Sequence, residues 1–140
     1  MNNFILFAGL LFMFMPGCDI ANAQDAQNGS LSIFCTAPAV YGKGREESEI
    51  AERVNLKTQY FANCYGRNIT SGEAREFKVR FRFVIKPAGN VDSVTIVFDG
   101  TKNAGFLECM KGIFMQMQFA KIPLNHGDCA VEQSVIFRVL

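Results

Sequence analysis

The chain has 140 residues, 49% of them hydrophobic, and its 14 basic and 13 acidic residues give a formal net charge of +1. This length is enough for one domain with one hydrophobic core and too short for two ordinary domains. The near-neutral charge predicts no general affinity for nucleic acid.

The N-terminus carries an apolar run over residues 4–15 that Pro16 and Gly17 close. A bilayer-spanning helix needs about 20 apolar residues, so this shorter run is typical of a signal peptide. Ala21-Asn22-Ala23 has the small-x-small pattern of a cleavage site. We therefore predict a signal peptide over residues 1–23 and a periplasmic or secreted protein.

An alternative interpretation of the N-terminus stays open. Met15-Pro16-Gly17-Cys18 is similar to a bacterial lipoprotein box, in which Cys18 would become the lipidated first residue. The protein would then be anchored at the periplasmic side of a membrane. Contact with a membrane is expected only if Cys18 carries the lipid.

Removal or lipidation of Cys18 leaves four cysteines, and an even set in an oxidising compartment predicts two disulfides by three possible pairings. Cys64 and Cys109 each lie three residues after a phenylalanine on the apolar face of a predicted helix, which favours a Cys64–Cys109 bond. Cys35 and Cys129 would then join the N-terminal segment 24–45, with its short strand at residues 31–35, to the last strand.

Neither a metal site nor a cofactor is predicted. The chain has no Cys-x-x-Cys motif, and its single histidine, His126, has no second histidine to share a metal. A catalytic triad would have to be built around that one residue, whose neighbours are typical of a turn. We therefore expect no enzymatic activity and assign no catalytic residue.

The main domain is predicted over residues 46–140, beginning with a helix over 47–65. Acidic residues gather where this helix begins, and Gly66 follows where a left-handed cap would end it. Residues 76–99 then alternate apolar and polar side chains around Pro87-Ala88-Gly89-Asn90, which is typical of a β-hairpin. The side chains predicted to be buried in the hairpin are Phe77, Val79, Phe81, Phe83, Ile85, Val94, Ile96 and Phe98.

A second helix, capped by Asn103, is predicted to end near Met117, and a last strand covers residues 131–140. The predicted fold is thus α+β with the order α-β-β-α-β: a three-stranded antiparallel sheet with two helices on one face. The last strand should lie beside the first hairpin strand and form an exposed edge that could bind a partner strand. The candidate edge residues are Ser134, Val135, Ile136, Phe137, Arg138 and Val139.

The other face of the sheet is predicted to be open and basic, since it would carry Lys78, Arg80, Arg82 and Lys86. This basic face could bind anionic lipid, polysaccharide or nucleic acid. A solvated face with cross-strand partners such as Glu132, Asp99 or hydroxyl groups explains the same pattern. Sheets that bind nucleic acid add aromatic side chains to such a face, and none is predicted here.

Residues 50–140 resemble the AgmX/PglI C-terminal domain family, a relative of the TonB C-terminal domain. The resemblance is carried by Cys64-Tyr65, Phe83-Val84-Ile85-Lys86-Pro87-Ala88-Gly89-Asn90-Val91 and Leu107-Glu108-Cys109. It implies a periplasmic domain that binds partners by adding a strand at a sheet edge.

The expected function is an exported, non-catalytic binding module of the cell envelope. Its expected partner is an envelope protein or a second copy of the chain. The alternative is a lipid-anchored structural protein, or a binder of anionic envelope polymers through the basic face.

Overall fold

The computed structural model describes residues 30–70 and 75–140. The predicted signal peptide and Cys18 lie outside the described residues. In chain order the elements are β1 (Leu31–Cys35), β2 (Ala39–Tyr41), α1 (Glu47–Asn55), α2 (Thr58–Asn68), β3 (Glu76–Ile85), β4 (Val91–Asp99), α3 (Ala104–Met115), the 3-10 helix η1 (Leu124–His126) and β5 (Cys129–Val139).

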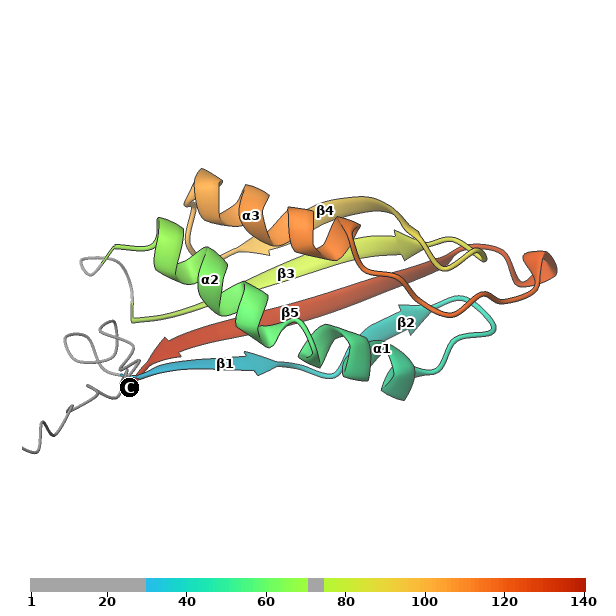
Figure 1. The fold of residues 1–140 in the computed structure, drawn as a ribbon, viewed down its shortest axis with the longest axis horizontal. Helices are drawn as coiled ribbons and strands as arrows, with labels where there is room; N and C mark the ends of the chain where they lie inside the picture. Colours follow the sequence, from blue (N-terminus) through green and yellow to red (C-terminus); the bar gives the residue numbers. More distant parts are fainter. Residues whose placement is uncertain (1–29, 71–74) are drawn as a thin grey trace, which may run out of the picture.

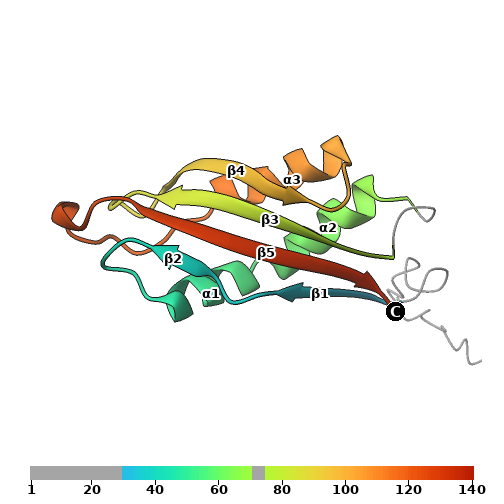
Figure 2. The same ribbon diagram turned by 180° about the vertical axis from the view of Figure 1, so that it is seen from behind.

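The strands form one antiparallel sheet of five strands in the order β1-β5-β3-β4, with β2 also paired to β5. The three helices lie on one face (Figure 1), and the other face carries no helix (Figure 2). An α+β fold with an antiparallel sheet is therefore confirmed. The prediction of three strands is wrong, because β1 and β2 of the N-terminal segment complete the sheet.

The last strand, β5, lies beside β3 as predicted, but it is not an edge. Ile136 lies opposite Lys78 of β3 on one side and opposite Phe34 of β1 on the other. At the start of the predicted edge, the carbonyl of Ser134 accepts a hydrogen bond from the N–H of Thr36 at 3.1 Å. The prediction of a free edge over residues 134–139 is wrong, since β1 occupies that side of β5.

The buried face of β3 is confirmed: its five predicted side chains all lie in the core. The hairpin turn requires glycine at position 89. Gly89 has a φ of 97° and lies against the Phe119 carbonyl, where a Cβ atom would clash.

Phe98 differs from the prediction, because it is not buried but 49% exposed. The β3–β4 register shifts next to it, so that Phe98 lies opposite Arg80, and this bulge turns Phe98 to the open face.

The predicted first helix is two helices, and the prediction of one helix over 47–65 is wrong. The hydroxyl of Thr58 donates to the carbonyl of Asn55 at 2.7 Å, a bond that competes with the helical N–H at that carbonyl. Gly66 is not a cap either, because α2 continues to Asn68. Both helices still point apolar side chains into one core: Ile50 and Val54 from α1, Phe61 and Cys64 from α2.

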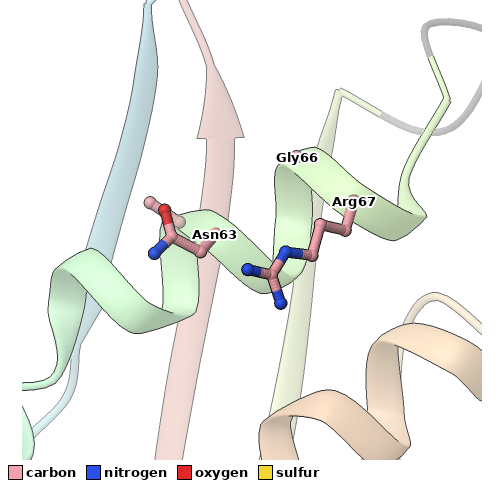
Figure 3. A pocket seen from close by; sticks show the side chains of 4 residues that line it. Asn63, Gly66 and Arg67 are labelled. Carbon is pink, nitrogen blue, oxygen red and sulfur yellow. The ribbon is translucent and has the colours of Figure 1, made fainter.

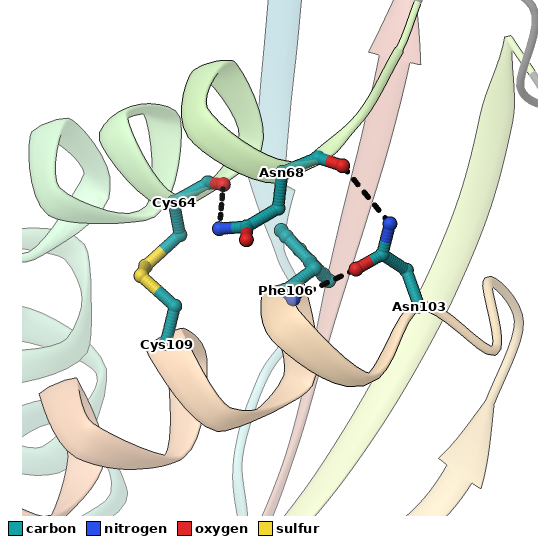
Figure 4. The surroundings of a disulfide bond; sticks show 5 residues. All are labelled: Cys64, Asn68, Asn103, Phe106 and Cys109. Carbon is teal, nitrogen blue, oxygen red and sulfur yellow. Dashed lines mark hydrogen bonds between the residues drawn. A yellow bond between two sulfur atoms is a disulfide. The ribbon is translucent and has the colours of Figure 1, made fainter.

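A disulfide and a hydrogen bond are among the contacts that join α2 to α3 and its cap (Figure 4). Cys64 and Cys109 form a disulfide with their Cα atoms 5.7 Å apart, which confirms this pairing. Asn103 caps α3, since its Oδ1 accepts from the N–H of Phe106 at 2.9 Å. The Nδ2 of the same Asn103 donates to the carbonyl of Asn68 at 2.9 Å, where α2 ends. The cap therefore also holds the end of the neighbouring helix.

Asn103→Ala is expected to lower the free energy of unfolding by about 1 to 2 kcal/mol, because both the cap and the bond to Asn68 are lost. Asn103→Asp keeps the accepting oxygen of the cap and should lose less. Urea unfolding of the two variants and the parent protein measures the difference. An Asn103→Ala protein as stable as the parent would contradict this role.

Candidate functional site

The longest free edge of the sheet is β4, which ends the strand order and has nine residues. The opposite edge consists of the short strands β1 and β2, of five and three residues. Pro38 lies between these two strands and has no N–H to donate. The segment after α3 reaches only the beginning of β4, where Asn90 forms a bridge with Gln118.

The free edge of β4 carries no charge along residues 93–98, between Asp92 and Asp99. Val97 and Phe98 are 48% and 49% exposed. Natural proteins usually protect edge strands with charges, prolines or bulges. The β3–β4 register shifts at both ends of residues 93–96, so bulges flank that segment, but its own positions have neither a charge nor a proline.

The predicted basic face is the open face of the sheet. Two of its four cations, Lys86 and Arg82, form ion pairs with carboxylates. Lys86 donates to Asp128 at 2.9 Å, and this bond is the main cause that raises the pKa of Lys86. Arg82 pairs with Glu132 at 3.3 Å, one of the partners named from the sequence. Lys78 and Arg80 form no ion pair with a carboxylate within the described residues.

Aromatic side chains do lie on this open face, so the expectation of none is wrong. They are Phe34 of β1, Tyr41 of β2 and Phe98 of β4, which are 62%, 54% and 49% exposed. The guanidinium of Arg82 lies 5.9 Å from the ring centroid of Tyr41, and Nζ of Lys78 lies 5.5 Å from that of Phe98. These aromatics were missed because two come from strands of the N-terminal segment and the third is turned outward by a bulge.

Cys35 and Cys129 are free thiols, and the prediction of a bond between them is wrong. Cys35 lies opposite Val135 in the middle of β5, whereas Cys129 is the first residue of β5 and lies opposite Ile85. Six residues of strand separate Val135 from Cys129, or about 20 Å, while a disulfide needs Cα atoms within about 7 Å.

Both free thiols lie in environments that disfavour the reactive thiolate. Burial raises the pKa of Cys35 to about 11. Burial also raises the pKa of Cys129, which is fully buried, although the nearby Arg45 acts in the opposite direction. A thiol needs a lowered pKa to act as a nucleophile at neutral pH, so the two side chains behave as small apolar residues.

A buried arginine that the sequence did not single out lies beside Cys129. Arg45 donates from Nη2 to the carbonyl of Lys86 at 3.1 Å, and its Nη1 is 3.6 Å from Oε1 of Glu49. Its guanidinium also lies 5.8 Å from the ring centroid of Phe119. Arg45 thus holds the start of α1 against the end of β3 and the segment after α3, a structural role.

A surface pocket on α2 is lined by Ala62, Asn63, Gly66 and Arg67 (Figure 3). Gly66 leaves this space open because it has no side chain, and the four residues form no catalytic group. Across residues 30–70 and 75–140, no group of three His, Cys, Asp or Glu side chains could hold a metal ion. Within the same residues no helix is long and apolar enough to cross a membrane.

Comparison with known proteins finds no match, either among protein-family models, among curated proteins or among solved structures. The candidate sites are therefore defined by geometry alone. They are the free edge of β4 and the open face of the sheet.

Proposed function

We propose that the protein is an exported, non-catalytic module of the cell envelope that binds a partner protein by strand addition at β4. The observation that carries this proposal is the free edge of β4, with its uncharged residues 93–98. Backbone groups of such an edge supply the hydrogen bonds for an added strand. The resemblance to TonB-like C-terminal domains, which implies strand addition, supports the same mechanism.

The side chains of β4 define the partner strand that would fit. Val94 and Ile96 are half-buried and pack against the core, whereas Ser93 and Thr95 are exposed. Alternate side chains of an added strand point to the same two faces. The expected partner segment is therefore a short extended stretch that alternates apolar and polar residues.

Val94→Pro is expected to abolish partner binding. The N–H of Val94 points away from β3 to the free side of β4, so proline removes a donor for an added strand and obstructs pairing at the edge. Val94→Ile keeps the backbone N–H and the β-strand preference and is the matched control. A photo-crosslinking residue at Val97, compared with one at Tyr41 on the opposite edge, would be introduced into the exported protein in its own cells. Crosslinks to the partner are expected from position 97 only, and they should disappear in the Val94→Pro background.

Circular dichroism must show that the Val94→Pro protein is folded before its binding is interpreted. A folded Val94→Pro protein that keeps the crosslinked partner would overturn strand addition at β4. Crosslinks from position 41 instead would move the site to the β1–β2 edge.

A further inference from the structure

A row of side chains crosses the open face of the sheet between two ion pairs, and none of the side chains in this row is acidic. On one side of it Arg138 binds Glu76 at 2.9 Å, and on the other side Arg82 binds Glu132 at 3.3 Å. We call the residues between these pairs the open-face row. They are Phe98 of β4, Lys78 and Arg80 of β3, Ser134 and Ile136 of β5, and Phe34 of β1.

The open-face row has aromatic rings at its ends and cations between them. The register places Arg80 opposite Phe98, and it places Ile136 opposite both Lys78 and Phe34. Four neighbouring strands span about 14 Å from the first to the last, and the two cations lie about 7 Å apart along β3. The row is therefore about as long as a few sugar units of an extended polymer.

The two cations of the row are available for an external anion. Neither Lys78 nor Arg80 has a carboxylate partner among the described residues. The hydrogen bond that Arg80 makes there joins its Nε to the hydroxyl of Ser134 at 3.3 Å. A neutral hydroxyl leaves the positive charge of the guanidinium unmatched, so both cations favour a negative ligand.

We propose that the open-face row binds an acidic polysaccharide in which carboxylated sugars alternate with neutral ones. The chain runs diagonally across the strands from Phe98 to Phe34. Lys78 and Arg80 lie on either side of this path on β3 and bind a sugar carboxylate there, while the apolar faces of the neighbouring sugar rings lie on Phe34 and Phe98. This site uses the face of the sheet and not its edge, so it is independent of the proposed strand addition.

The charges on this face favour a sparsely charged linear chain over two other anionic partners. An anionic bilayer is a plane of charge and would also meet Glu76 and Glu132, which flank the row. Single-stranded nucleic acid carries a charge on every nucleotide, whereas this chain has a pI of about 7.6 and a net charge of +1. A polymer charged at every second sugar needs only the two unmatched cations.

The test is calorimetric titration of the exported protein with hyaluronan octasaccharide, in which glucuronate alternates with a neutral sugar. Lys78→Gln and Phe34→Ala are each expected to weaken binding about tenfold. Lys57→Gln makes the same change of charge immediately before α2, away from the open face, and should bind like the parent. The edge variant Val94→Pro, if folded, should also bind like the parent, which separates this site from strand addition.

Three results would overturn the proposal: no binding of the octasaccharide, equal weakening by Lys57→Gln and Lys78→Gln, or tighter binding to another anion. The competing anions are vesicles of phosphatidylglycerol and a deoxythymidine oligonucleotide. Thermal unfolding of each variant must show an intact fold, so that lost binding is not lost structure.

Discussion

Replacing both Cys64 and Cys109 by alanine is expected to lower the free energy of unfolding by about 4 kcal/mol. The bond joins residues 45 positions apart, and a cross-link over that distance restricts the unfolded chain by about this amount. Small domains are stable by only about 5 to 15 kcal/mol, so the loss is a large fraction of the total. Urea unfolding of the oxidised parent protein and the double variant measures the difference.

Cys35→Ala is the control for this double variant, because Cys35 has no bonded sulfur and its replacement removes no cross-link. Its loss should be smaller than that of the double variant by several kcal/mol. Alkylation of the unreduced, unfolded protein should modify Cys35 and Cys129 and leave Cys64 and Cys109 unmodified. Modification of all four would show that the bond is absent in the native protein.

Ile136→Pro is expected to unfold the protein, because it breaks the central strand. Ile136 is paired with Lys78 on one side and Phe34 on the other, so no side of β5 can accept a residue without an N–H. Proline inside a regular element costs about 3 kcal/mol or more, and here its ring also obstructs the pairing with β1, toward which the N–H of Ile136 points. The measurement is the melting temperature, followed by circular dichroism.

Ile136→Val keeps the N–H and most of the side chain, and should cost about 1 kcal/mol or less. Val94→Pro on the edge strand β4 should be less damaging than Ile136→Pro, since the N–H of Val94 points to the free side of β4 and bonds no other strand. If Ile136→Pro melted at the temperature of the parent protein, β5 would have to be an edge strand after all.

The candidate sites were only partly predictable. The cations of the open face follow from alternation along β3, and the pair between Arg82 and Glu132 was among the partners named from the sequence. Phe34 and Tyr41 could not be placed on this face, because β1 and β2 have five and three residues and carry too few positions for a clear period. From the sequence alone, the free edge is predicted at β5, because no local pattern of residues indicates how many strands lie beside a given strand.

The sequence by itself determined the features that depend on neighbouring residues. The alternation of β3, the hairpin turn at Gly89, the cap at Asn103 and the inward position of the bonded cysteines are all set by local periodicity and dihedral preference. These patterns are sufficient for an α+β fold with one apolar sheet face.

Only the tertiary structure decided that β5 is central, that β4 is the free edge and that Cys35 lies beside the middle of β5, far from Cys129 at its beginning. A strand exposes the same backbone donors and acceptors on both sides, whatever its side chains. Which strands pair, and in which register, is therefore set by competition among segments far apart in the chain. That competition is resolved only when the whole core packs.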